Sequence, residues 1–368
     1  MASPSDPATH ETFQLGEFTV PRLWAGLWQL SSNAWGTAPV TKIRQAMARH
    51  VDAGYTAFAD HYGSAELIFG QFRASLPQPE TVMGATKWCV FKPLTGPLQR
   101  SAVEAAVRER IERMQTKRVD LLQFHWQHYD NHDYMTALGI MAQLREEGLI
   151  ANVGLCNFDA LRTDEICTRF PGLVVSNQVP VSARAPSPSP LSAHRPRANP
   201  PFWTQFSLID TRVLSALDGV CTKHGVKLLT YGTLCGGFLA EKWIGVPEPD
   251  PYAGSLNPSQ RKYLDMITKA WGSWALFQEL LVALQRISRR HGGASVTNIA
   301  TRWVLDHPVV GAVIVGVRWG CSEYPSDNMK VYGLHLTDQD REEIESVLSR
   351  SAGRRLFQTI GDCGAEYR

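Results

Sequence analysis

Three short segments of the chain carry side chains that could move a proton, and each segment closes an apolar run that predicts a strand. The segments are Asp60-His61-Tyr62-Gly63, Ala85-Thr86-Lys87-Trp88 and Gln123-Phe124-His125-Trp126. In a parallel barrel, the C-terminal ends of the strands converge on the face that carries the chemistry. An ammonium at that face lowers the pKa of a nearby tyrosine, and a histidine can orient a carbonyl or relay a proton. Tyr62, Lys87 and His125 together therefore predict protonation of a carbonyl oxygen while a cofactor delivers hydride.

Each of these residues has a plainer interpretation when it is taken alone. A lysine at a strand end is usually a solvated charge, and a histidine on an apolar strand is usually a hydrogen-bonded core residue. Tyr62 alone could be an aromatic residue on the rim of a pocket. The order of the three residues on successive strand ends favours the chemical interpretation.

Strand-like and helix-like runs alternate along the chain, which predicts a parallel sheet covered by helices. Strands are predicted at residues 23–30, 55–60, 82–88, 119–126, 151–156, 173–179, 227–230 and 312–317. Helices are predicted at residues 41–53, 65–76, 101–114, 133–147, 159–169, 212–223, 274–290, 296–306 and 338–348. Ser101 with Glu104 predicts a capping box. Eight strands favour an α/β fold of the closed (β/α)8 TIM-barrel type, with residues 1–368 forming one domain that has long loops and an extra C-terminal helix.

The composition is that of an ordinary soluble domain, with 44% apolar and 20% charged residues. A net charge of +2 gives no reason to expect nucleic acid or an anionic membrane as a partner. The seven cysteines form no CxxC pair, so we expect neither a metal site nor a disulfide framework. Residues 1–12 are polar and no apolar run reaches membrane-spanning length, so we expect a cytoplasmic protein.

The three segments that contain Tyr62, Lys87 and His125 resemble segments of the aldo-keto reductase family, and the resemblance covers residues 18–348. It implies a (β/α)8 barrel that binds NADPH in extended form and reduces a small-molecule aldehyde or ketone. It also implies that Tyr62 is the general acid, that Lys87 lowers the pKa of this tyrosine, and that His125 orients the substrate carbonyl.

The expected cofactor site does not depend on a GxGxxG segment, because none follows the first predicted strand. The resemblance instead implies NADP-binding residues at the ends of the fifth to eighth strands. They are Cys156, Asn157 and Gln178 for the carboxamide, Tyr231 for stacking on the nicotinamide, Gly232, Thr233 and Leu234 along the pyrophosphate, and Arg318 and Asn328 at the adenosine end. Members of the family usually have Ser or Thr where this chain has Cys156.

Arg318 suits a 2′-phosphate because its planar guanidinium matches a dianionic phosphate, which favours NADP over NAD. A solvated loop charge is the alternative interpretation of the same residue. Trp28 and Trp126, both at strand ends, are predicted to line an apolar substrate pocket, and core packing is their alternative.

One departure from the family pattern affects the chemistry. Related sequences read Phe-Asp-Met-Ala-Asp-His-Tyr-Gly, whereas this chain passes from Phe58 directly to Ala59 and then to Asp60. The two absent residues include the Asp that pairs with the catalytic Lys in the family. A loss of two residues preserves the facing of the preceding strand, because side chains alternate with a period of two. Asp60 is a poor substitute, since it lies only two residues before Tyr62. We therefore expect impaired activity.

The second departure is residues 180–204, which separate segments that are nearly contiguous in the family. This stretch contains prolines at 180, 186, 188, 190, 196, 200 and 201, and its composition predicts a disordered or polyproline-like insert. It is either a genuine lid or recruitment loop, or an unspliced intron that is translated in frame. We favour the second interpretation, because structureless loops of this length are uncommon inside compact domains.

Two functions remain open. The first is NADPH-dependent reduction of an aldehyde or ketone, with Tyr62 as the proton donor. The second is a non-catalytic NADPH-binding barrel that acts as a sensor or regulatory partner, which the absent Asp favours. The physiological substrate, the direction of the reaction and the oligomeric state are not encoded in any motif of this chain.

Overall fold

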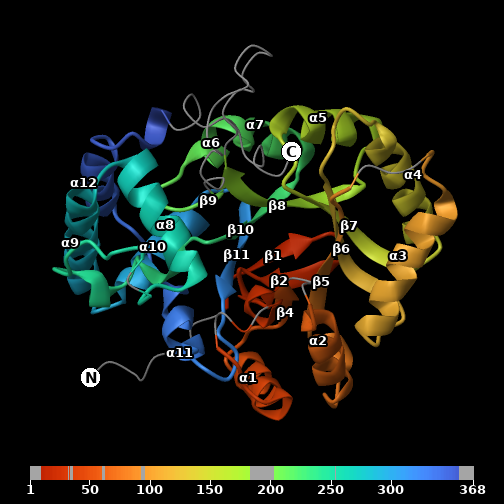
Figure 1. Ribbon diagram of the computed structural model, residues 1–368, viewed down its shortest axis with the longest axis horizontal. Helices are drawn as coiled ribbons and strands as arrows, with labels where there is room; N and C mark the ends of the chain where they lie inside the picture. The colour runs from red at the N-terminus through yellow and green to blue at the C-terminus, as the bar shows by residue number, and fades with distance from the viewer. Residues whose placement is uncertain are drawn as a thin grey trace.

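The strands form a closed parallel barrel in the computed structural model (Figure 1). The structure describes residues 10–31, 33, 36–59, 63–92, 96–182, 203–252 and 254–355. Consecutive strands pair in parallel, and the ring closes where β8 pairs with β10 and where β11 pairs with β3. The strands are β3 Leu23–Gly26, β4 Ala57–Ala59, β5 Met83–Val90, β6 Val119–Trp126, β7 Ile150–Cys156, β8 Val174–Ser182, β10 Lys227–Tyr231 and β11 Val310–Gly316. The predicted (β/α)8 architecture is confirmed.

Each barrel strand is buried on both faces, which explains why its sequence is an almost continuous apolar run. The inward side chains form one cluster, which includes Trp24, Met83 and Leu121. The outward side chains, such as Phe58 and Phe124, belong to a second and larger cluster between the strands and the helices. The alternation between the two clusters tells which side chains of a strand face the barrel interior.

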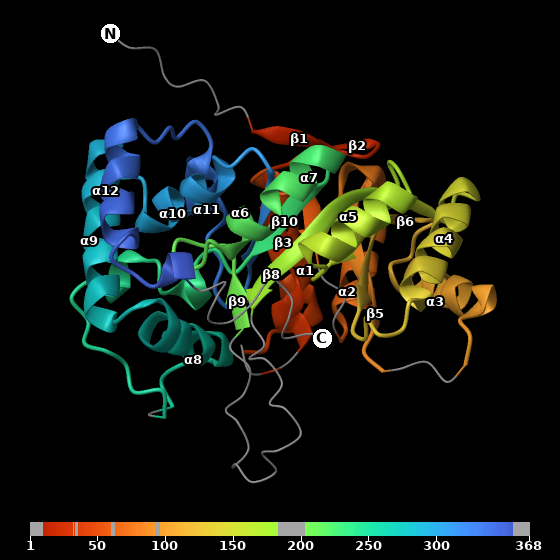
Figure 2. The same ribbon diagram turned by 90° about the horizontal axis from the view of Figure 1, so that it is seen from above.

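A hairpin that the sequence analysis did not predict closes the N-terminal end of the barrel. It consists of β1 Thr12–Leu15 and β2 Phe18–Pro21, which pair antiparallel. Figure 2 shows it lying across one end of the strands. Leu15 and Val20 are buried and belong to the interior cluster, so the hairpin fills the end of the barrel opposite to the predicted chemistry.

Helices surround the strands (Figure 1). Their bounds are α1 Val40–Asp52, α2 Ala65–Ala74, α3 Arg100–Arg113, α4 Asp133–Glu146, α5 Ala160–Arg169, α6 Arg212–Ala216, α7 Asp218–His224, α8 Pro258–Asp265, α9 Trp274–Arg290, α10 Val296–Leu305, α11 Pro325–Asn328 and α12 Asp338–Leu348. The predicted helix at 212–223 is two short helices, α6 and α7, which are separated at Leu217. The predicted capping box at Ser101 is wrong, since α3 begins at Arg100 and its N-cap Gln99 makes no side-chain bond.

The ends of the Pro-rich segment are ordered strands, which corrects the prediction that the insert begins at residue 180. Pro180 pairs with Gln205, and Ser182 pairs with Trp203, in an antiparallel ladder between β8 and β9 Trp203–Gln205. Residues 183–202 lie outside the described part of the chain. The ladder places the two ends of the segment side by side at the C-terminal end of β8.

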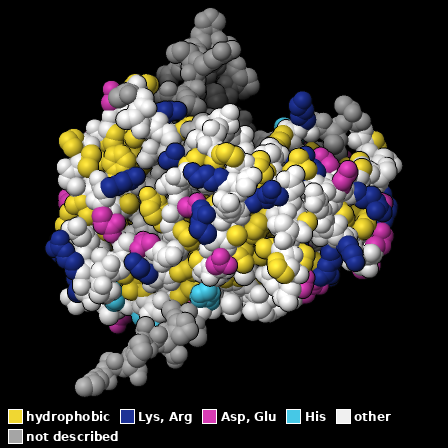
Figure 3. All heavy atoms as spheres, turned by 90° about the horizontal axis from the view of Figure 1, so that it is seen from below, with side chains coloured by type: hydrophobic (Ala, Val, Ile, Leu, Met, Phe, Trp, Pro, Cys, Tyr) yellow, Lys and Arg dark blue, Asp and Glu magenta, His cyan; other side chains and the backbone are white. Residues whose placement is uncertain are grey.

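Charges of both signs are interspersed on the face of the molecule shown in Figure 3. This mixture agrees with the nearly equal numbers of basic and acidic residues, 37 Lys and Arg against 35 Asp and Glu. Surface ion pairs such as Arg100–Glu147 and Arg286–Glu343 link neighbouring helices. No helix in the described ranges is long and apolar enough to cross a membrane.

Candidate active site

Polar side chains replace apolar ones on the inner face of the barrel toward the C-terminal ends of the strands. Lys87 continues the inward series of Ala85 on β5, and His125 continues that of Leu121 on β6. They are only 3% and 2% exposed. Cys89 of β5 pairs with His125, so Lys87 lies two residues before the level of the histidine on the neighbouring strand. The structure therefore brings two of the three predicted catalytic residues to one end of the barrel.

The third predicted catalytic residue, Tyr62, lies outside the described residues, together with Asp60 and His61. On the preceding strand β4, Ala57 and Ala59 face the barrel interior. Ala59 pairs with Ala85, two residues before Lys87 on β5. The described residues of β4 thus present methyl groups, and no carboxylate, to the interior beside Lys87.

His125 is held by its strand neighbours. Its Nδ1 lies 3.0 Å from the carbonyl oxygen of Cys156, and its Nε2 lies 3.4 Å from Oε1 of Gln127. Because a carbonyl oxygen only accepts, Nδ1 carries a hydrogen in this arrangement. Nε2 can then donate to a substrate carbonyl only when the ring is doubly protonated.

Phe91, which the sequence analysis missed, packs against this histidine with 5.4 Å between the ring centroids. Its side chain is 53% exposed just after β5, so it offers an apolar wall at the mouth of the barrel. A large apolar residue directly after the strand that carries Lys87 is the signal that could have identified it.

The predicted carboxamide-binding residues also come together. Cys156 pairs with Gln178 across β7 and β8, and the backbone N–H of Asn157 donates to the carbonyl of Gln178 at 3.0 Å. Asn157 has a φ of 66°, a left-handed conformation that asparagine tolerates better than most residues. The Cys156 thiol donates to Oδ1 of Asn157 at 3.5 Å. All three residues are buried at the ends of adjacent strands.

The next strand supplies the predicted stacking residue. Tyr231 ends β10 and packs against the interior cluster, and it pairs with Ile314 of β11. Gly232 follows with a φ of 74°, and the hydroxyl of Thr233 donates to the carbonyl of Phe206 at 3.2 Å. That hydroxyl is thus used within the protein, and Leu234 packs on the outer core. Only the backbone of this turn is well suited to the predicted pyrophosphate contact.

At the predicted adenosine end, the exposed Arg318 lines a cavity of about 180 Å³ between the end of β11 and the start of α1. Gln29, Trp319 and Cys321 line the same cavity. Asn328 is the half-buried last residue of α11 and is not among the lining residues. Of the two residues predicted for the adenosine end, Arg318 therefore borders this cavity and Asn328 does not.

The two tryptophans predicted for the substrate pocket have different environments. Trp28 begins a short helix, Trp28–Ser31, and its side chain is 39% exposed. Trp126 is buried outside the barrel, packs on Phe124 and Tyr134, and donates from Nε1 to the carbonyl of His128 at 2.8 Å. Core packing accounts for Trp126, and only Trp28 has surface to offer a ligand.

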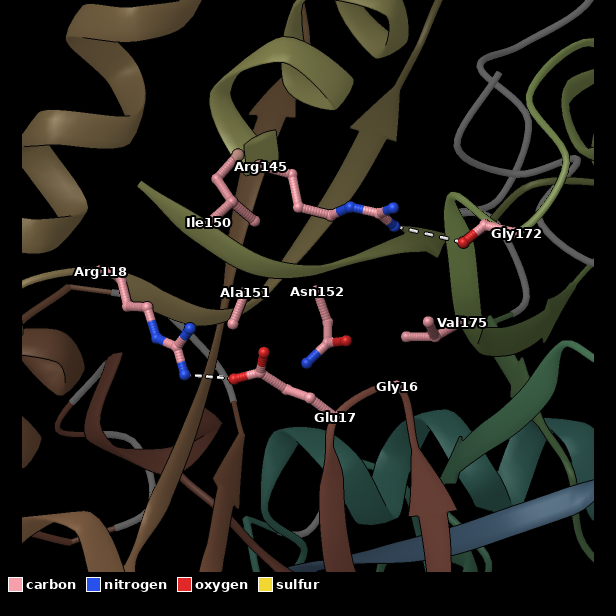
Figure 4. Close-up of a pocket in the computed structure, with 9 residues that line it drawn as sticks. All are labelled: Gly16, Glu17, Arg118, Arg145, Ile150, Ala151, Asn152, Gly172 and Val175. Atoms are coloured by element: carbon pink, nitrogen blue, oxygen red, sulfur yellow. Dashed lines mark hydrogen bonds and ion pairs between the residues drawn. The ribbon is translucent and has the colours of Figure 1, made fainter. Parts of the chain in front are cut away.

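A larger cavity of about 390 Å³ lies at the opposite, N-terminal end of the barrel (Figure 4). Glu17 of the hairpin turn pairs with Arg118 there, and Arg145 donates to the carbonyl of Gly172. Both arginines of this cavity are thus engaged with protein groups. The N-terminal end of such barrels serves stability rather than chemistry. Within the described ranges, no group of three or more potential metal ligands occurs.

Comparison with known proteins agrees with the barrel fold. Residues 22–349 match the model of the Aldo/keto reductase family. The aldo-keto reductase YhdN of Bacillus subtilis is 23% identical over an alignment of 351 residues, which covers 90% of each chain. The structure of a glycerol dehydrogenase from Gluconobacter oxydans superposes with a TM-score of 0.69 at 19% identity, covering 93% of this chain and 96% of that one. A thermostable aldo-keto reductase solved with the inhibitor epalrestat gives a TM-score of 0.63 at 20% identity, covering 92% of this chain and 99% of that one.

Proposed function

The chain belongs to the aldo/keto reductase family, and on that premise we propose that it reduces an aldehyde or ketone with NADPH, with Tyr62 as the proton donor. Membership implies oxidoreductase chemistry on carbonyl compounds. The observation that carries the finer proposal is the burial of Lys87 and His125 on the inner face of the neighbouring strands β5 and β6, toward the C-terminal ends of these strands.

The residues present fit a nicotinamide cofactor. The backbone hydrogen bond from Asn157 to Gln178 brings two residues with amide side chains to neighbouring positions, and a carboxamide is complementary to such groups. Tyr231 on the next strand offers a ring for stacking, and Arg318 offers a guanidinium for a phosphate. When it is bound, NADPH supplies the hydride.

The remaining chemistry belongs to the side chains of the protein. The Tyr62 phenol gives its proton to the carbonyl oxygen as hydride reaches the carbonyl carbon, and the product is an alcohol. The Lys87 ammonium favours the phenolate and so makes the phenol a better acid. Doubly protonated His125 donates to the same oxygen from Nε2 and orients it. Trp28 and Phe91 form the apolar walls that receive the rest of the substrate.

The side chains on the inner face of β4 lead us to expect a lower rate of carbonyl reduction than in family members that have the carboxylate. Ala57 and Ala59 stand on the inner face of β4, where the family pattern provides a carboxylate for the lysine, and neither side chain can supply one. The same observation favours the second candidate function, a barrel that binds NADPH and acts as a sensor or regulatory partner.

An assay of NADPH oxidation with a panel of aldehydes and ketones separates the two candidates. We expect the parent protein to turn over slowly, and a variant with Asp-Met inserted between Phe58 and Ala59 to turn over faster. A parent that binds NADPH while neither protein reduces any carbonyl would support the sensor function instead.

The cofactor preference has its own test, in which NADPH and NADH are titrated against tryptophan fluorescence. We expect tighter binding of NADPH, and we expect Arg318→Ala to narrow the difference. Arg289→Ala, which removes an exposed arginine of α9, is the matched control and should leave the difference unchanged. Equal responses to both cofactors would remove the NADP assignment.

A further inference from the structure

The last turn of α3 holds the backbone beside two of the proposed catalytic residues. Arg110 donates from Nε to the carbonyl oxygen of Lys87 at 2.9 Å. Arg113, one turn later, donates from Nη2 to the carbonyl oxygen of Gly63 at 2.7 Å. Gly63 directly follows Tyr62 in the chain. Two arginines of one helical turn therefore donate to the backbone carbonyl of the lysine and to the backbone carbonyl of the glycine that follows the tyrosine.

A buried carboxylate ties this pair of contacts together. Glu66, in the first turn of α2, is only 4% exposed. One of its carboxylate oxygens accepts from Nε of Arg113 at 2.5 Å, and the other accepts from the hydroxyl of Thr86. Thr86 is fully buried on the outer face of β5 and precedes Lys87. The network fixes the strand from outside the barrel while the ammonium of Lys87 remains on the inside.

We propose that Arg110 and Arg113 are positioning residues, which set the place of Lys87 relative to the chain segment that bears Tyr62; this rests on the proposed function. A misplacement of about 1 Å can cost 10²-fold in rate, and the influence of an ammonium on a phenol falls with their separation. On β4, the described inward residues are alanines, so they contribute no ionic contact that would fix this separation. The α3 turn supplies the fixed frame from the outer side.

The chain contains a matched control in Arg73 of α2. Its Nε donates to the carbonyl of Pro79 at 3.0 Å, and its Nη1 donates to Asp120 at 2.7 Å. Asp120 in turn accepts from the backbone N–H of Gly84 at 2.9 Å. This arginine thus also combines a backbone carbonyl with a buried carboxylate, but it anchors the beginning of β5, three residues before Lys87.

The test measures the titration of Tyr62 directly, so it does not depend on turnover. The tyrosinate absorbance of each protein is recorded against pH, and the curve of its Tyr62→Phe counterpart is subtracted, which leaves the Tyr62 signal. We expect Arg110→Lys and Arg113→Lys each to raise the Tyr62 midpoint by about one pH unit, because the ammonium loses its fixed place. Arg73→Lys should leave the midpoint unchanged.

The reductase assay provides a second measurement on the same proteins. Arg110→Lys and Arg113→Lys should lower kcat about tenfold or more with little change in KM, whereas Arg73→Lys should leave kcat unchanged.

The melting temperature of each variant shows whether a loss of activity results from unfolding. If Arg110→Lys or Arg113→Lys fails to fold, Glu66→Gln provides another disruption of the same network. An unchanged Tyr62 midpoint in folded Arg110→Lys, Arg113→Lys or Glu66→Gln would overturn the proposal. Equal shifts in the Arg73→Lys control would overturn it too. If the variants show the expected midpoint shifts but the parent reduces no carbonyl, the result would count against the proposed function alone.

Discussion

The two ends of the barrel are built from the same strands, but different side chains fill the interior at each end. At the N-terminal end, Leu15 and Val20 of the hairpin close the interior with apolar groups. At the C-terminal end, Lys87, His125 and Gln178 are equally buried but polar or ionisable. Burying such groups costs free energy, and at the C-terminal end they can act together on a ligand. Substitutions at the two ends should therefore separate activity from stability.

The largest effect on activity is expected from Lys87→Met, which removes the buried ammonium at the C-terminal end. Carbonyl reduction should fall by about 10²-fold or more, because the phenol loses the charge that favours its ionised form. Lys227→Met at the N-terminal end of β10 is the control, since the side chain of this lysine donates to the carbonyl of Pro308 at 3.0 Å. Comparable losses in the two variants would show that the ends do not differ as described.

The converse variant is Leu15→Ala, which empties part of the apolar closure. We expect it to lower the free energy of unfolding by about 2–5 kcal/mol, the usual cost of a large-to-small substitution in a core. Turnover of the remaining folded protein should be unchanged. Leu161→Ala, at a leucine that is 67% exposed on α5, should cost far less. Chemical denaturation of the parent, Leu15→Ala and Leu161→Ala gives the three free energies of unfolding. Turnover of each protein is measured at denaturant concentrations below its unfolding transition.

A smaller effect is expected at α12, far from both ends. Burial opposes ionisation of Asp340, but hydrogen bonds from His291, Arg290 and Thr337 outweigh it and hold the pKa of this carboxyl well below its usual range. A lowered pKa stabilises the fold above the unfolded value of about 3.9, and this contribution is lost as the pH falls below it. Asp340→Asn should therefore lower the melting temperature at neutral pH. The difference from the parent should shrink below about pH 4, and a constant difference across this range would contradict the assignment.

The smallest effect on stability is expected from shortening the Pro-rich segment. Residues 183–202 can be replaced by Asn-Gly, which favours the two-residue turn that a paired Ser182 and Trp203 require. The melting temperature should stay the same or rise, because loop closure becomes less costly. A marked fall would show that the segment contributes to the packed fold.

The sequence predicts the barrel well because buried parallel strands leave a strong local signature. The predicted strand at 119–126 coincides with β6, and the eight predicted strands all correspond to barrel strands. The sequence does not predict the hairpin at residues 12–21, because each of its strands has only four residues and most of these residues are not buried. The buried Leu15 and Val20 of these strands gain their apolar contacts from the barrel that the hairpin closes.

The helix capping boxes and the hydrogen bonds of Arg113 could not be predicted from local sequence patterns. Ser101 and Glu104 have the spacing of a capping box, but the boxes in the structure are at Asn257 with Gln260 and at Thr337 with Asp340. The contacts of Arg113 with Gly63 and Glu66 join residues about 50 positions apart, and no local pattern encodes them. Residue types at strand ends could be predicted from the sequence, whereas the groups that hold those ends in place required the structure.

The most direct test of the account is Tyr62→Phe, which removes only the phenolic hydroxyl. NADPH affinity and carbonyl reduction are measured in parallel on the variant and the parent. The account predicts that the affinity stays within about twofold while turnover falls by about 10²-fold or more, since a general acid contributes on that order. A variant that reduces the same aldehydes and ketones as fast as the parent would contradict the assignment of Tyr62 as the proton donor.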